Sequence, residues 1–407
     1  MNRGTVLRLL AIAALLAVSL AACTPPEEQP SGNARGPAKV PDMPSEPVAI
    51  DIIDVAGNLA LTKGMIERYA DEHPEMVADV TYTEATSPEL AGKVKAQQDA
   101  GRVDIDLVLT GTDGLSAGVE QDLWLKLLPN YNEKFPDLTS NYTEPAADMQ
   151  ELAQDYGITV TYYPSGPLIE YNPEAIPDPP KTADDLLAWA KENPEKFQYA
   201  RPANSGPGRT FLMGRPYILG DDDPKDPRDG WDKTWAYLEE LGKYIEYYPS
   251  GTTDTMEELA DGTRDMIATT TGWDINPRVL GTVPKDVEVG TIEGFHWVTD
   301  AHYMVVPRGI EDGNLAVVLD LMSYMLEPEQ QALAYDDGYF YPGPAVEGVT
   351  LDMAPESSQK AIEEYGRSFY DELIEKVPTE TPLETADLVY AFERWDREIG
   401  GSKIKEE

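Results

Sequence analysis

A polar loop near the middle of the chain has the composition of a ligand-binding loop. It spans Ala203 to Leu212, where two glycines and a proline precede an apolar run, and this pattern predicts a loop that opens a helix. The first N–H groups of a helix have no partner within the helix and lie at the positive end of its dipole, so such a loop can hold an anion or another polar group. An ordinary glycine–proline turn would contain the same residue types. The candidate ligand-binding residues of the loop are Ser205, Gly206, Arg209 and Thr210.

One short pattern could support catalysis. The sequence GLSAG at residues 114–118 matches the Gly-x-Ser-x-Gly turn that carries the nucleophile of many hydrolases. In that turn the serine directly follows a strand, whereas Ser116 is expected inside a helix, and the base would have to be His296 or His302. A secreted serine hydrolase that uses Ser116 stays as an alternative, and the protein is expected not to be an enzyme.

Motifs for metals and cofactors are missing from the sequence. It has three histidines and one cysteine, without a His-Glu-x-x-His pattern or a cysteine pair, so a zinc site lacks ligands. Neither of the glycine-rich loops that bind dinucleotides and nucleotide phosphates occurs. We therefore expect no metal site, no cofactor and no catalytic residues.

The N-terminal residues have the pattern of an export signal. Arg3 and Arg8 precede an uncharged apolar run, and Leu-Ala-Ala before Cys23 forms a small-residue cleavage site. This site resembles the lipobox of bacterial lipoproteins, in which lipid such as palmitate is attached to the cysteine. We expect a signal peptide over residues 1–23 that ends at a lipidated Cys23, and a proline-rich tether over residues 24–47. The protein should then lie outside the cytoplasm, anchored to the cell membrane by lipid.

The charge of the chain argues against one class of partner. The 32 lysines and arginines are outnumbered by 74 aspartates and glutamates, which gives a formal net charge of −42. Because phosphate binding needs clustered basic residues, a nucleic acid is not expected as a partner. The acidic residues are spread along the chain, which is typical of a solvated, self-repelling surface. Independently of this charge, the protein is expected to be a monomer.

Strands that alternate with helices position the first group of candidate residues. Strand patterns, such as those at residues 48–54 and 103–110, are separated by helical patterns, which predicts an α/β fold with a mostly parallel sheet flanked by helices. Ligands bind beyond the carboxyl ends of the strands in such sheets. Asn58 follows the first of these strands, and Thr112 and Asp113 follow the second, so these three residues are candidates for one site.

The second half of the chain predicts a further sheet with polar residues at a strand end. A helix at residues 255–261, with Thr255 and Glu258 placed as a capping box, precedes a strand at residues 266–270. β-type residues at 301–306 then return the chain to the first sheet. The candidate site residues of this half are Trp273 and Asp274 after the strand, with Trp297 and His302 near the return as weaker candidates.

Three stretches together resemble a known family. They are Leu259 to Ile267, with the pattern L-x-x-G-x-x-x-M, then Ile169 to Asn172, and Met325 to Gln331, which is followed by Gly-Tyr-Phe-Tyr-Pro. In their order and spacing they resemble the extracellular solute-binding proteins of ABC importers, which have the two-lobed type II periplasmic binding fold. Residues 196–202, before the Ser-Gly of the polar loop, are most similar to the members that bind polyamines, thiamine or iron.

The resemblance implies an architecture and a function. Lobe 1 would comprise residues 48–157 and 301–345, and lobe 2 residues 158–300 and 346–407 with the C-terminal helices, joined by hinge strands. The lobes would close on a small polar solute and deliver it to an ABC permease in the membrane. Arg209 favours a negative group on the solute, whereas Asp113 and Asp274 favour a positive one, so a polyamine-like, thiamine-like or zwitterionic solute stays open. A surface or adhesion lipoprotein without a ligand is the other alternative.

Overall fold

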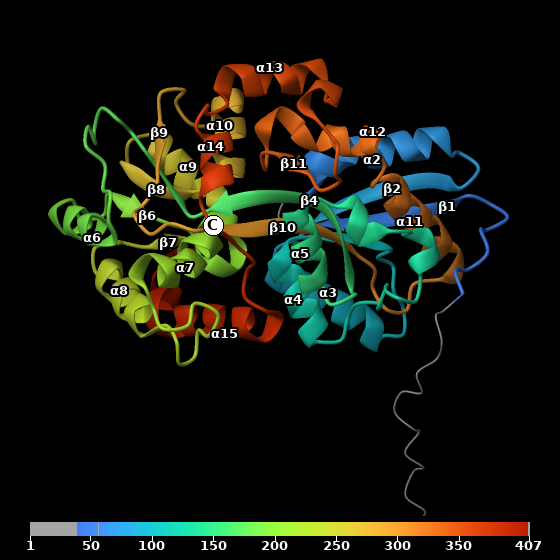
Figure 1. Ribbon diagram of the computed structural model, residues 1–407. Coiled ribbons are helices and arrows are strands. Elements are labelled where there is room, and N and C mark those ends of the chain that lie inside the picture. The colour runs from blue at the N-terminus through green and yellow to red at the C-terminus, as the bar shows by residue number, and fades with distance from the viewer. Residues whose placement is uncertain (1–38, 56, 406–407) are drawn as a thin grey trace, which may run out of the picture. The chain divides into compact units, whose positions relative to one another are not determined.

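The computed structural model of the protein describes residues 39–55 and 57–405 (Figure 1). The predicted signal peptide, Cys23 and most of the predicted tether lie outside the described residues. Residues 39–47, the described part of that tether, form neither helix nor strand. Within the described ranges, every helix is too short or too polar to span a bilayer.

The larger of two main sheets organises the first lobe. Its strand order is β11-β4-β10-β3-β1-β2, and β12 pairs with β10. Strand β1 is parallel to β2 and β3, whereas β10 is antiparallel to β3 and β4. The strands are β1 (Val48–Asp54), β2 (Val77–Glu84), β3 (Leu107–Thr110), β4 (Gly157–Gly166), β10 (Trp297–Val305), β11 (Gly343–Pro344) and β12 (Thr379–Glu380).

A four-stranded sheet in the order β6-β8-β5-β9 organises the second lobe. Only β6 and β8 of this sheet are parallel, so its pairing is mixed. The α/β fold with two sheets is therefore as predicted, but the pairing is less parallel than predicted because β4 and β5 enter, and β10 returns, antiparallel to their neighbours. The strands are β5 (Leu168–Tyr171), β6 (Phe197–Gln198), β8 (Met266–Thr269) and β9 (Glu288–Gly290), and a separate pair is formed by β7 (Tyr248–Pro249) and β13 (Ile404–Lys405).

Helices cover both sheets, and β4 and β10 run side by side between the lobes (Figure 1). The helices beside the larger sheet are α2 (Leu59–Glu72), α3 (Ser87–Asp99), α4 (Thr112–Glu120), α5 (Glu144–Leu152), α11 (Asp312–Tyr324) and α12 (Pro328–Gln331). Those of the second lobe and the C-terminal part are α6 (Ala183–Glu192), α7 (Gly206–Leu219), α8 (Asp232–Gly242), α9 (Thr252–Ala260), α10 (Ile275–Leu280), α13 (Glu356–Tyr365), α14 (Tyr370–Lys376) and α15 (Thr385–Trp395). The predicted lobe boundaries stay a prediction.

Helical spacing of apolar residues accounts for the packing of α2. Met65 and Tyr69 lie four residues apart on one face of the helix, and both pack in one buried cluster with Ile50 and Ile52 of β1. Burial of each large apolar side chain of this kind contributes about 2–3 kcal/mol. This packing fixes the end of β1 relative to the start of α2.

Local hydrogen bonds decide where the elements begin. Thr182 and Asp185 form a capping box at the start of α6, with N···O distances of 3.0 Å in both directions. The predicted capping box at Thr255 is wrong, because α9 begins three residues earlier and the Thr255 hydroxyl donates to the carbonyl of Thr252 (2.6 Å). Strand β3 begins later than predicted, at Leu107.

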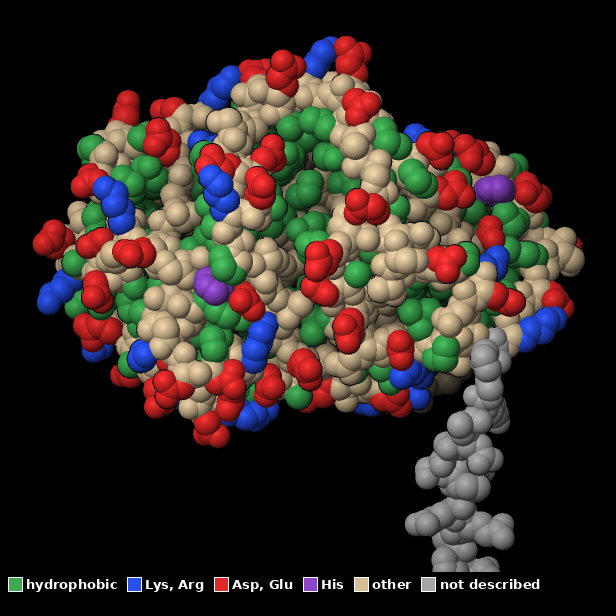
Figure 2. All heavy atoms as spheres, in the orientation of Figure 1, with side chains coloured by type: hydrophobic (Ala, Val, Ile, Leu, Met, Phe, Trp, Pro, Cys, Tyr) green, Lys and Arg blue, Asp and Glu red, His purple; other side chains and the backbone are tan. Residues whose placement is uncertain are grey.

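Acidic side chains are scattered over the visible face of the molecule, with few lysines and arginines between them (Figure 2). This distribution agrees with the formal net charge of −42. Most of the acidic side chains are therefore solvated and screened by salt. The few that are buried around one cavity are screened much less.

Candidate functional site

Both lobes contribute to a cavity of about 320 Å³. That volume is at the lower end of the range for small-molecule sites. Residues from β4 and β10 line it, the second lobe supplies helix N-termini and a tryptophan, and the first lobe supplies a glycine and two aromatic side chains. The lining residues are Gly57, Tyr163, Asn204, Gly206, Arg209, Gly251, Thr252, Thr253, Trp273, Asp300, His302, Tyr339 and Phe340.

The predicted polar loop forms one wall of this cavity. The predicted helix is present as α7, but it already begins within the predicted loop, at Gly206, and the Ser205 side chain caps it by accepting the N–H of Gly208 (3.1 Å). The Ser205 hydroxyl also lies 2.8 Å from the hydroxyl of Thr252, in the first turn of α9. A Cβ on Gly208 would lie 2.2 Å from the carbonyl oxygen of Ala200, so this position requires glycine. The N-termini of α7 and α9 are thereby held together at the cavity.

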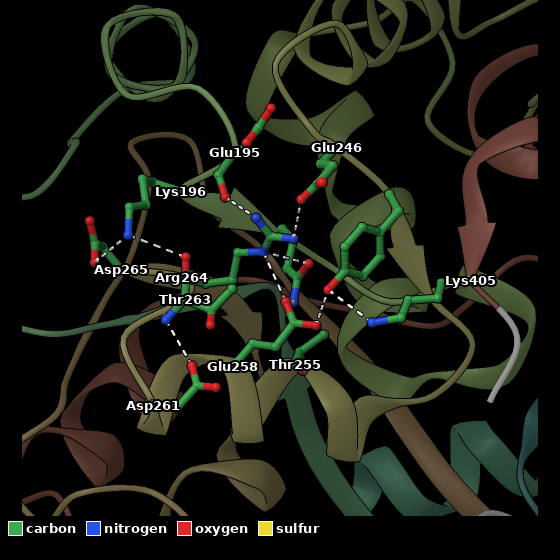
Figure 3. A network of polar contacts seen from close by, with 12 residues as sticks. Glu195, Lys196, Glu246, Thr255, Glu258, Asp261, Thr263, Arg264, Asp265 and Lys405 are labelled. Carbon is green, nitrogen blue, oxygen red and sulfur yellow. Dashed lines mark hydrogen bonds and ion pairs between the residues drawn. The ribbon is translucent and has the colours of Figure 1, made fainter.

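A buried arginine holds the other end of α9 in place (Figure 3). Arg264 is 2% exposed, and its Nε donates to Glu258 near the end of α9 and to Gln198 of β6, both at 2.9 Å. Its Nη2 pairs with Glu246 at 3.2 Å. These bonds fasten α9 to the second sheet, and so they position the Thr252 end of the helix at the cavity.

Arg209 lies at the centre of a buried ion cluster. It is 4% exposed, its Nη1 lies 3.2 Å from Asp113 of α4, and its Nη2 pairs with Asp300 of β10. Burial alone would lower the pKa of Arg209, but the carboxylates of Asp300 and Asp113 outweigh burial and raise it, so the guanidinium stays charged. The cluster connects α7 of the second lobe with α4 of the first.

Asp300 also lines the cavity, and it is not among the candidate residues predicted from the sequence. It is 1% exposed, and it accepts hydrogen bonds from Thr112 Oγ1 (3.0 Å) and Tyr163 OH (2.8 Å) in addition to its pairing with Arg209. Its own strand neighbour Ala301 donates a fourth bond, N–H to Oδ1 (3.0 Å). The signal in the sequence was an acid in the middle of an apolar strand. With these four donors, Asp300 has little capacity left for a ligand N–H.

His302 lines the cavity as a neutral imidazole. Burial lowers the pKa of His302 to about 4, since the side chain is 1% exposed. Its Nδ1 is buried without a hydrogen-bond partner among residues 39–55 and 57–405. The ring stands edge-on to Phe340, with centroids 4.5 Å apart. His302 can therefore offer a nitrogen to a ligand without adding charge.

Asn58 lies behind the cavity wall and does not line it. Its backbone N–H donates to Asp54 Oδ1 (2.9 Å), and its Oδ1 accepts the Thr62 hydroxyl (3.0 Å). Burial raises the pKa of Asp54 to about 6, although the N–H groups of Leu59 and Asn58 oppose this shift. Asn58 therefore belongs to the start of α2, next to the Gly57 that does line the cavity.

Three other candidate residues are directed away from the cavity. The carboxylate of Asp274 accepts the Tyr370 hydroxyl (2.6 Å) and pairs with Arg278 and Arg367 at 3.0 and 2.7 Å, so it fastens the C-terminal helices rather than facing a ligand. Trp297 is fully buried and donates its indole N–H to the carbonyl of Leu373. The Thr210 hydroxyl donates to the carbonyl of Gly206 within α7 (3.1 Å).

The arrangement around Ser116 differs from that of a hydrolase. Ser116 lies inside α4, with half of the helix on either side, instead of on a sharp turn after a strand. Among the described residues, no group of His, Cys, Asp and Glu is arranged to hold a metal ion.

The fold is similar to that of solved solute-binding proteins. A spermidine/putrescine substrate-binding protein from Streptococcus pneumoniae superposes with a TM-score of 0.54 at 15% identity, over 85% of this chain and 99% of that chain. Apo ferric ion-binding protein A from Pasteurella haemolytica gives 0.57 at 15% identity, over 86% and 97%. The periplasmic binding protein AfuA from Actinobacillus pleuropneumoniae, with fructose-6-phosphate bound, gives 0.59 at 13% identity, over 86% and 98%.

Sequence comparison identifies the family. A search of curated proteins finds no match. The family model for bacterial extracellular solute-binding proteins, however, matches residues 64–363. These residues include the four strands of the second sheet, every strand of the larger sheet except β1 and β12, and most of the cavity lining. The two-lobed chain therefore belongs to the bacterial extracellular solute-binding protein family.

Proposed function

We propose that the protein binds a small, positively charged solute in the cavity between its lobes and delivers it to the permease of an ABC importer. The observation that carries this proposal is the compensation of Arg209 by two buried carboxylates. One guanidinium and two carboxylates have a formal net charge of −1. Because a low-dielectric cavity strengthens electrostatic interactions, this residual charge favours a cation over an anion.

The other lining groups support the same preference. Arg209 is the one basic side chain among the described lining residues whose charge persists at neutral pH, since His302 is neutral there. Four aromatic side chains line the cavity: Tyr163, Trp273, Tyr339 and Phe340. Aromatic rings attract cations through their quadrupole, and this attraction grows when the cation is desolvated.

The similar structures do not identify the ligand of this protein, because proteins of this one fold are named for spermidine/putrescine, for ferric ion and for bound fructose-6-phosphate. The charge of the solute therefore needs a direct test. A thermal-shift and calorimetric panel would compare solutes of matched size and different charge: putrescine and benzamidine as cations, butane-1,4-diol and benzamide as neutral molecules, succinate and benzoate as anions. A ligand at about a hundred times its dissociation constant adds about 2.7 kcal/mol of stability.

We expect binding by at least one cation and none by the matched neutral or anionic solutes. An Asp300→Asn variant should lose most of that binding, whereas Asp265→Asn, a less buried position outside the cavity, should keep it. Binding of succinate or benzoate in preference to the cations would overturn the charge assignment. A zwitterion such as 4-aminobutyrate, added to the panel, separates a cation site from a site for both charges.

We also propose that Cys23 carries lipid that anchors the protein at the outer side of the membrane, and that the protein acts as a monomer. The pattern before Cys23 and the extracellular family support the first part. Incorporation of radiolabelled palmitate into wild type but not into Cys23→Ser would support the anchor, and equal labelling of both would contradict it. Light scattering of the variant would give the oligomeric state.

A further inference from the structure

Phe340 occupies a slot between two tyrosines in the cavity wall. Its ring is stacked on Tyr163, with centroids 4.5 Å apart and an interplanar angle of 13°. On its other face it is stacked on Tyr339, with centroids 4.2 Å apart and an angle of 21°. Both faces of Phe340 are therefore covered, and the ring is 3% exposed. The two tyrosines are spaced to hold one flat ring between them.

The backbone of Phe340 is strained. Its φ is +52°, in the left-handed region that a bulky residue rarely adopts. The surroundings hold it there, since a Cβ on Gly272 would lie 2.2 Å from Phe340 Cδ1, and only a glycine gives the ring this space. Such strain persists only where neighbouring groups enforce it.

Groups at the edge of the slot can recognise a solute. His302 lies against Phe340 with the two rings nearly perpendicular, at 78°, and has a buried Nδ1 without a partner among the described residues. Trp273 stands edge-on to Phe340 on another side, with centroids 6.3 Å apart. Asp300 accepts a hydrogen bond from Tyr163 OH, which places negative charge at the end of one stacking ring.

We propose that the slot between Tyr163 and Tyr339 is a stacking subsite for a planar group of the solute, and that Phe340 occupies this subsite until the solute displaces it. The subsite suits a flat, delocalised cation, such as an aromatic amidine, which can stack on both tyrosines and approach the charge of Asp300. This deepens the proposed function and rests on it, because it assigns a shape to the cationic solute.

The test compares two cations of equal charge and similar size that differ in planarity. Benzamidine has a flat aromatic ring, whereas cyclohexanecarboxamidine carries the same amidinium on a puckered ring. Affinities would be measured by calorimetry for wild type, Phe340→Ala and Phe340→Gly, with Phe135→Ala as a control that removes a buried phenylalanine of the first lobe away from the cavity. We expect Phe340→Ala and Phe340→Gly to bind benzamidine at least tenfold more tightly than wild type, with no comparable gain for cyclohexanecarboxamidine.

A second measurement does not depend on the stability of the Phe340→Ala and Phe340→Gly variants. A fluorine label on the Phe340 ring of the full-length protein would report its environment by NMR. Benzamidine should shift or broaden this signal, and cyclohexanecarboxamidine should not. Unchanged benzamidine affinity in both variants, or an equal gain for the two amidines, would overturn the stacking subsite.

This experiment tests the cation preference and the stacking subsite independently of each other. If the Phe340 variants gain affinity for benzoate and benzamide as much as for benzamidine, the slot is supported and the cation preference is wrong. If putrescine binds wild type but no planar solute gains from the variants, the cation preference is supported and the slot is wrong.

Discussion

Arg209 of α7 and Asp113 of α4 form an ion pair of 3.2 Å that joins the two lobes. Both side chains are more than nine-tenths buried, so their charges are shielded little by water. The pair lies directly beside the cavity that Arg209 lines. The same contact therefore influences both the closure of the lobes and the charge of the site.

Replacement of Arg209 by methionine should strongly destabilise the protein. The change leaves the carboxylates of Asp113 and Asp300 buried without their cation, which typically costs about 3–5 kcal/mol. Urea denaturation would measure the free energy of unfolding. The matched control is Arg308→Met, which breaks an exposed pair with Asp122 (2.8 Å) and should cost less than about 1 kcal/mol. Equal losses in the two variants would show that the buried cluster is not a source of stability.

His302 should make the protein less stable in mild acid. Its pKa is about 4 in the folded protein and about 6.5 when exposed, so between these values the unfolded chain binds a proton that the folded protein does not. Stability contributed by His302 is thus lost as the pH falls from about 6.5 to about 4, by up to about 3 kcal/mol. Urea denaturation across this range would compare wild type with His302→Gln, and with His73→Gln as a control for a more exposed histidine. Parallel curves for wild type and His302→Gln would refute the prediction.

Asp54 should show the opposite dependence over nearly the same range. Burial raises the pKa of Asp54 to about 6 in the folded protein, from 3.8 when exposed. The folded protein therefore keeps a proton that the unfolded chain has released, and the stability contributed by Asp54 is lost as the pH rises from about 4 to about 6. The Asp54→Asn variant should not show this loss. The free energy of unfolding of wild type minus that of the variant, measured by urea denaturation, should therefore decrease as the pH rises. A difference that increases with pH would contradict the assignment.

Removal of the Ser205 cap should affect both stability and binding. Ser205→Ala removes the cap of α7 and the contact with Thr252, and loss of an N-cap costs about 1 kcal/mol. The control is Thr182→Ala, which removes the cap of α6 outside the cavity at a similar cost. Only Ser205→Ala should also weaken the binding of the cation identified in the solute panel. Equal affinities in the two variants would mean that Ser205 serves the helix alone.

Local patterns in the sequence pointed to residues that line one cavity in the structure. Arg209 and Trp273, which follow from local patterns, both line the cavity. Asp274 follows the same strand, but its carboxylate binds Arg367, which is 93 residues away, and no local pattern reports so distant a partner. The function of these residues in binding stays a prediction.

The residues that the sequence did not predict were missed for one physical reason: long-range contacts bring them to the cavity. Asp300 lies within a strand and Tyr163 within another, so a search at strand ends does not find them. They reach the cavity because β4 and β10 cross between the lobes side by side. Phe340 follows a family-like motif, but its place in the slot depends on Gly272 and Tyr163, which are far from it in sequence.

The order in which the chain is synthesised bears on the pairing of its strands. Strand β3 meets β10 only after almost two hundred further residues have been made, and β7 meets β13 only at residues 404–405. Neither the larger sheet nor the β7–β13 pair can be completed until most of the chain has left the ribosome. Such long-range pairing is slow to form. The strands that complete the larger sheet, β10, β11 and β12, are thus all made within the last third of the chain.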